Sequence, residues 1–234
     1  MIKPCDEHIG NPRVTADHSD DLHRDIHAKY LRAHPEARFV QPTTAETWWC
    51  TAQLPDQVYW RSLALHETAH AILGVLVGQE LLGLTLVQDR NILVPGGAMI
   101  QGSVNAQLAA VGILGGPHAQ ARWLAEQGYT HPELKRCVIR LGGHSDARQV
   151  KAAKAEGLLI DRRRAVKDAL RVLGRRRTAA AHLEITERLL ADGAVPPAAV
   201  SAALERHGVR KPKGVWIPSA EDFARHKERL AARR

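Results

Sequence analysis

The chain has little of what marks secreted or membrane proteins. Its 234 residues include only three cysteines, which are far apart and show no CxxC spacing, so a disulfide framework is not expected. The first twenty residues contain no apolar signal core. The longest uncharged apolar runs, AILGVLVG and LLGLTLV, are far below the roughly 20 residues that a membrane span needs. The sequence therefore predicts a soluble, cytoplasmic protein with no membrane partner.

Acidic residues are outnumbered, and the formal net charge is +8 at pH 7. Arginine triplets occur at Arg162–Arg164 and Arg175–Arg177. A basic surface can indicate a nucleic-acid partner. However, the basic residues are spread over several segments and few aromatic residues lie among them, which favours ordinary solvated helix faces. A nucleic-acid partner stays an alternative that the composition does not favour.

The pattern of apolar residues predicts a mainly α fold with a small β hairpin or sheet beside one central helix. That helix is expected from about Pro55 or Gln57 to Val77, ending at Gly78. We expect an N-terminal extension with one or two helices (1–55), a central domain (56–208) and a basic C-terminal tail with a helix (209–234). Further elements are predicted as strands in LLGLTLVQD and GGAMIQGSV, a long helix containing Gly115, Gly116 and Pro117, a helix capped by Ser145, and helices at about Arg162–Ala191, Pro196–His207 and Ser219–Arg233.

The segment LALHETAHAIL places His66, Glu67 and His70 in a helix that is otherwise apolar. Residues four apart lie on one helix face, so both imidazoles can bind one ion. Glu67 is rotated by about 100° from His66 and can instead reach a water molecule there. Zinc with three protein ligands keeps a fourth position open. It lowers the pKa of water from about 15.7 toward 7, and a nearby carboxylate takes the proton.

The HExxH spacing thus predicts a Zn²⁺ site with His66 and His70 as ligands and Glu67 as the catalytic base. Two alternatives stay open: hydrogen-bonded core histidines with an exposed Glu67, and a metal site without catalysis. The third ligand must come from elsewhere, because the extended pattern HExxHxxGxxH fails at Leu73 and Leu76. The candidates are Asp89, His144 and Asp146. Asp146 would begin a helix, where the dipole favours a carboxylate.

Four segments in order resemble the peptidase domain of FtsH-type zinc proteases: ALHETAHAILGVLVG, LTLVQDRNILVPGGAMIQG, GILGGPHAQARW and GGHSDARQVKAA. The similarity covers roughly Trp60 to Leu204. It implies that Asp146 is the third zinc ligand, because it matches the aspartate of that family's GASNDLEKAT segment. Two features depart from the family. No Walker A sequence is present, and His118 and Gln120 stand in HAQA where the family has an acidic pair.

The resemblance implies a zinc-dependent metallopeptidase that hydrolyses peptide bonds in unfolded or flexible protein segments, without its own ATPase motor. The substrate would extend along an edge strand near Ala98 to Gly102. A separate ATPase or a homo-oligomer is a further expected partner. One rival is a regulatory metallopeptidase with another third ligand. The other is a catalytically inactive zinc-site protein that binds DNA or a protein through its basic helices, Arg162–Arg177 and Arg225–Arg234.

Overall fold

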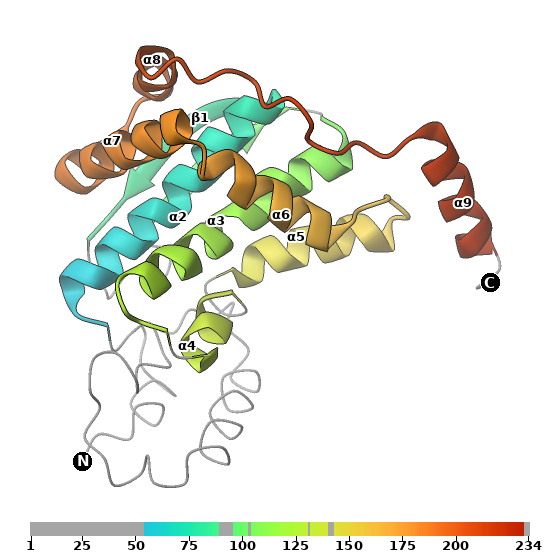
Figure 1. Cartoon of the computed structure of the whole chain (residues 1–234), viewed down its shortest axis with the longest axis horizontal. Helices are drawn as coiled ribbons and strands as arrows, with labels where there is room; N and C mark the ends of the chain where they lie inside the picture. The colour runs from blue at the N-terminus through green and yellow to red at the C-terminus, as the bar shows by residue number, and fades with distance from the viewer. Residues whose placement is uncertain (1–53, 89–95, 103, 131, 140–142, 232–234) are drawn as a thin grey trace, which may run out of the picture.

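The computed structural model describes residues 54–88, 96–102, 104–130, 132–139 and 143–231. Over these residues the chain is mainly helical with one small three-stranded antiparallel sheet (Figure 1), which confirms the predicted fold class. The helices expected before residue 54 lie outside the described residues. The elements are α2 (Asp56–Val77), β1 (Glu80–Leu86), β2 (Gly96–Gln101), α3 (Ala106–Glu126), α4 (Pro132–Cys137), α5 (His144–Ala155), α6 (Arg162–Leu173), α7 (Arg176–Asp192), β3 (Ala194–Val195), α8 (Pro197–Arg206) and α9 (Ala220–Ala231).

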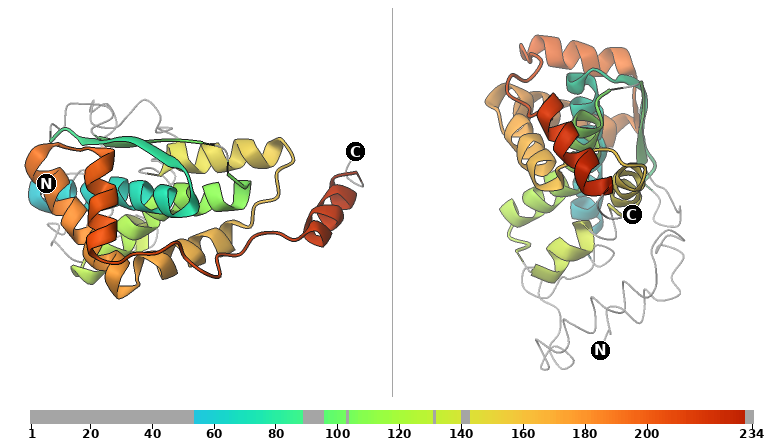
Figure 2. Two further views of the ribbon diagram at one scale, coloured as in Figure 1. Left: turned by 90° about the horizontal axis from the view of Figure 1, so that it is seen from above. Right: turned by 90° about the vertical axis from the view of Figure 1, so that its right-hand side faces the viewer.

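Helix α2 is the centre of the fold. It starts directly after Pro55 and ends at Gly78, whose φ of 98° is left-handed and stops the helix as predicted. Its apolar residues are nearly continuous, and Ala64, Ala69 and Ile72 are completely buried. The sheet lies on one side of α2 and α3, and α6 lies on the other (Figure 2). In the described part of the chain, no helix combines the length and apolarity needed to span a membrane.

The sheet has the strand order β2-β1-β3, so β2 is an edge strand. β1 and β2 form the predicted hairpin, with Leu84 opposite Ala98 and a register irregularity between Leu81 and Gly83. The third strand was not predicted. β3 has only two residues, and its two register pairs join Ala194 and Val195 to β1. Such a short strand leaves no alternating pattern in the sequence, so no pattern predicts it.

Two helix boundaries differ from the sequence prediction. The helix expected from Arg162 to Ala191 is two helices, because Gly174 ends α6 and α7 begins at Arg176. The arginine-rich sequence across this break hides it, since arginine is itself a good helix former. Helix α5 begins at His144, one residue before the predicted cap Ser145, and Gly143 precedes it. Asp146 therefore lies inside the first turn of α5.

Candidate metal centre

Two elements that are distant in the sequence bring three ligand atoms together. α2 presents the Nε2 atoms of His66 and His70, which lie 2.9 Å apart. The Oδ2 atom of Asp146, from the first turn of α5, lies 3.5 Å from each of them. All three side chains are buried. Within the described residues, these three form a group that could hold a metal ion. The structure therefore brings the predicted ligands to one point.

Small residues in α3 allow this convergence. A Cβ atom on Gly116 would lie 2.4 Å from the Nε2 of His70 and 2.8 Å from the Cδ2 of His66, so only glycine leaves room for the two rings. The start of α5 is seated on the same part of α3. A Cβ atom on Gly143 would lie 2.7 Å from the Cβ of Pro117. This close approach places Asp146, three residues later, beside the histidines.

Each histidine is held through its other ring nitrogen. The Nδ1 of His70 lies 2.9 Å from the carbonyl oxygen of Gly112, which can only accept, so Nδ1 donates. The Nδ1 of His66 lies 3.0 Å from the Oε1 of Gln120. The amide orientation of Gln120 follows from its neighbour. Ser62 donates its hydroxyl to the carbonyl of Tyr59, and the Nε2 of Gln120 donates to the Ser62 Oγ at 3.0 Å.

These hydrogen bonds fix the tautomer of both rings. With a proton on each Nδ1, the Nε2 atoms are the free ring positions, and they face each other. The Oδ2 of Asp146, a buried oxygen without a hydrogen-bond partner, faces the same point. Three electron-rich atoms at this distance repel one another unless a metal ion or a proton lies between them. The donor set and its second contacts therefore fit a metal ion.

The pKa shifts of His70 and Asp146 agree with a site that holds positive charge. Burial lowers the pKa of His70, but the Asp146 carboxylate and, less strongly, Glu67 outweigh burial and raise the pKa to about 9. Burial raises the pKa of Asp146, but the two histidines hold it well below its usual range. Without a metal, a proton on His70 is the cation that offsets the carboxylate. Metal binding must displace that proton.

Glu67 is buried beside the three candidate ligands and faces the sheet. Its Oε2 accepts a hydrogen bond of 3.1 Å from the backbone N–H of Ala98 in the edge strand β2. A Cβ atom on Gly96 would lie 3.1 Å from the Cγ of Glu67, so the start of β2 packs directly on this side chain. The exposed position of Glu67 that the alternative with hydrogen-bonded core histidines expected is therefore wrong. The carboxylate sits between the ligand group and a strand edge.

The remaining ligand candidates have different outcomes. Asp89 lies outside the described residues, and His144 is the first residue of α5. Sequence reasoning missed the contacts of Gly112 and Gly116 with His70, because a carbonyl and an absent side chain leave no motif. It did single out Gln120 as a departure from the family pattern. The structure shows that this amide binds His66.

Replacing Gln120 by Leu is expected to weaken metal binding by about 10- to 100-fold. The leucine cannot accept from the Nδ1 of His66, so the ring loses its fixed tautomer and orientation. Competition with a chromogenic chelator measures the affinity. Gln120→Glu is the matched control, because its carboxylate restores an acceptor and should preserve the affinity. Equal affinities for the wild type and Gln120→Leu would contradict this role.

The lowered pKa of His118 predicts a folding stability that depends on pH. Burial, and then the charges of Lys135 and Arg162, lower the pKa of His118 to about 4, from 6.5. The unfolded chain therefore binds this proton more readily than the folded chain. The contribution of neutral His118 to the free energy of unfolding is fully present above pH 6.5 and is lost as the pH falls toward 4. We expect the melting temperature of His118→Gln to fall less between pH 7 and pH 5 than that of the wild type, and parallel curves would contradict the assignment.

Comparison with known proteins does not identify the chain. No family model, no curated protein and no solved structure matches it.

Proposed function

We propose that the protein is a zinc-dependent metallopeptidase that hydrolyses peptide bonds in unfolded or flexible segments of other proteins. The observation that carries this proposal is the position of Glu67. A buried carboxylate lies beside a His-His-Asp group and is hydrogen-bonded to the edge strand β2. A purely structural metal site has no need of such a fourth group. The segment resemblance to FtsH-type peptidase domains points in the same direction.

Zinc is the ion that the donor set favours. Two neutral imidazoles and one carboxylate, with His70 and His66 oriented by acceptors behind them, are a ligand set of catalytic zinc sites. When bound, the ion would supply a Lewis acid for the scissile carbonyl and lower the pKa of the attacking water. His66, His70 and Asp146 would hold it. The metal and its identity are part of the proposal.

Residues of the chain would also bind the substrate and transfer the proton. β2 is an edge strand, so an extended peptide can add to it through backbone hydrogen bonds. The contact between Ala98 and Glu67 then places the carboxylate close to the bound backbone. Glu67 accepts a proton from the attacking water and passes it to the leaving amine nitrogen. Because only an extended chain can pair with a strand edge, folded substrates are excluded.

The proposed partners follow from the need for an unfolded substrate. These 234 residues contain no Walker A sequence, so unfolding by ATP hydrolysis would require an ATPase module outside them, for which we propose a separate ATPase as partner. A homo-oligomer is the other proposed partner. Without either, tails, unfolded segments and peptides are the expected substrates.

Cleavage of fluorescently labelled, unfolded casein tests the proposed activity. We expect a chelator to abolish cleavage and stoichiometric zinc to restore it, whereas a stably folded, loop-poor protein should stay intact. Fully zinc-loaded protein that does not cleave casein or a peptide library would contradict the peptidase proposal. That result would favour the non-catalytic alternative, for which salt-dependent retention on DNA is the direct assay.

A further inference from the structure

A second candidate site lies away from the metal centre, at the junction of α5, α6 and the C-terminal segment. A cavity of about 620 Å³ opens there. One wall consists of the end of α5, the connector 159–161 and the start of α6. The opposite wall consists of Trp216 and α9. Ligand pockets for small molecules have volumes of about 300–1,000 Å³, so the cavity has the size of a ligand site.

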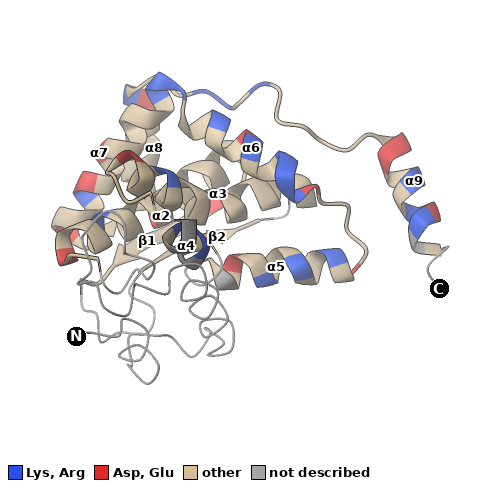
Figure 3. Ribbon diagram, turned by 60° about the horizontal axis from the view of Figure 1, so that its bottom comes forward, with Lys and Arg blue, Asp and Glu red and all other residues tan. Residues whose placement is uncertain are grey.

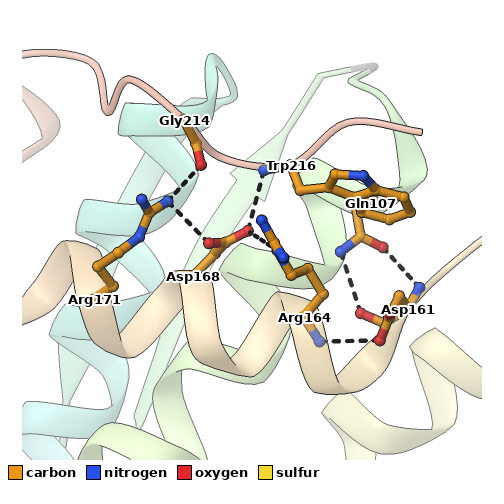
Figure 4. A network of polar contacts seen from close by, with 7 residues as sticks. All are labelled: Gln107, Asp161, Arg164, Asp168, Arg171, Gly214 and Trp216. Carbon is orange, nitrogen blue, oxygen red and sulfur yellow. Dashed lines mark hydrogen bonds and ion pairs between the residues drawn. The ribbon is translucent and has the colours of Figure 1, made fainter. Parts of the chain in front are cut away.

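Specific contacts hold the C-terminal wall in place. Asp168 of α6 is buried and accepts a hydrogen bond of 3.1 Å from the backbone N–H of Trp216 (Figure 4). Arg171 bridges the Asp168 carboxylate at 2.9 Å and the carbonyl of Gly214 at 2.6 Å. His226 of α9 lies 3.1 Å from the carbonyl of Gly157, after α5. The C-terminal segment that carries Trp216 is therefore hydrogen-bonded to α6 on one side of the cavity and to the end of α5 on the other.

The opposite wall is equally fixed. Gln107 of α3 is completely buried and forms a double hydrogen bond with the backbone of Asp161, accepting from its N–H at 2.8 Å and donating to its carbonyl at 3.2 Å. The Asp161 carboxylate caps α6 by accepting from the N–H of Arg164 (Figure 4). The positive end of the α6 dipole therefore faces this region.

The charges that line the cavity are unbalanced. Four cationic side chains line it, and within the described residues none of them has an acidic partner: Lys154, Arg162, Arg163 and Arg229. The two acidic side chains in the lining are already engaged. Asp161 caps α6, and Asp222 binds Ser219 and Arg225. Lysine and arginine positions, blue on the ribbon of Figure 3, occur at the end of α5, at the start of α6 and on α9.

We propose that this cavity binds a nucleoside phosphate. The unpaired cations and the start of α6 would bind the phosphate group, since arginine forms paired, charge-assisted hydrogen bonds with phosphate oxygens. Trp216 offers an aromatic face on which a base can stack, and Leu159 and Ile160 supply apolar surface. The proposal is independent of the peptidase activity, because none of these residues belongs to the metal centre.

The test uses the full chain with adenosine monophosphate, inorganic phosphate and adenosine as probes in calorimetric titrations at low salt. We expect adenosine monophosphate to bind more tightly than either fragment. The double variant Arg162→Gln/Arg163→Gln should weaken its binding by at least about tenfold. Trp216→Leu should weaken binding of adenosine monophosphate by a similar factor, because the base loses its stacking partner. Binding of inorganic phosphate should be unaffected, because residue 216 keeps its backbone hydrogen bond to Asp168. Chelator-treated and zinc-loaded protein should bind equally.

The matched control is Arg176→Gln/Arg210→Gln, which removes the same charge from exposed positions outside the cavity. It should retain the wild-type affinity. No saturable binding in the millimolar range, or equal losses in the two double variants, would overturn the proposal. Tight binding of a single-stranded oligonucleotide that both double variants weaken equally would also overturn the proposal. The positive charge would then belong to a diffuse nucleic-acid-binding surface and not to a nucleoside phosphate site.

Discussion

Glu67→Gln is expected to lower the rate of peptide cleavage by about 10²- to 10⁴-fold, the usual contribution of a general acid–base group. The amide cannot take a proton from water at neutral pH. It keeps an oxygen that can accept from the N–H of Ala98, so the packing of β2 on α2 should be preserved. Because Glu67 is not among the three grouped ligands, zinc affinity should stay unchanged.

This combination of lost turnover and retained metal separates catalysis from structure. Cleavage of labelled casein and zinc content are measured on the same preparation. Glu126→Gln, a change of the same type on an exposed side chain of α3 that pairs with Arg122, is the control and should behave as the wild type. A Glu67→Gln variant that cleaves at the wild-type rate would contradict the assignment of the base. A variant that loses zinc would show that Glu67 holds the site together.

Asp146→Asn is expected to lower zinc affinity by at least about 100-fold, which exceeds the usual loss of a contact behind a ligand. The substitution keeps the shape of the side chain but removes the negative charge that faces both Nε2 atoms. The remaining two imidazoles hold an ion poorly, because the third ligand and the charge balance are both missing. Zinc should therefore raise the melting temperature of the wild type but not that of Asp146→Asn.

The control for this prediction is Asp192→Asn, which removes the same charge at the exposed end of α7. It should keep the wild-type response to zinc. Chelator competition and thermal unfolding with and without zinc measure the two quantities. Unchanged affinity in Asp146→Asn would show that a different group completes the ligand set.

The sequence was sufficient to predict α2 and the common face of two candidate ligands, because both depend on local rules. Pro55 and Gly78 mark the ends of the helix, and the four-residue spacing of His66 and His70 fixes their common face. The position of the start of α5 beside the histidines depends instead on tertiary packing. It depends on Gly143 packing on Pro117, and no spacing rule connects those positions. Only the resemblance singled out Asp146 among the candidates.

The contacts around the site could not be predicted for a related reason. Gln120 reaches His66 only because α3 packs against α2, and its amide orientation depends on a hydroxyl of Ser62 that is bound to Tyr59. The C-terminal segment was predicted as a basic tail. Its attachment to α6 through Asp168 depends on a backbone N–H, which every residue except proline carries and which therefore leaves no signature.

The most direct test of the account is a crystal structure of the zinc-loaded protein with anomalous scattering recorded at the zinc edge. We predict one strong anomalous peak within about 2.0–2.2 Å of the Nε2 atoms of His66 and His70 and of a carboxylate oxygen of Asp146. An anomalous peak at other residues, with these three side chains free of metal at saturating zinc, would contradict the central claim.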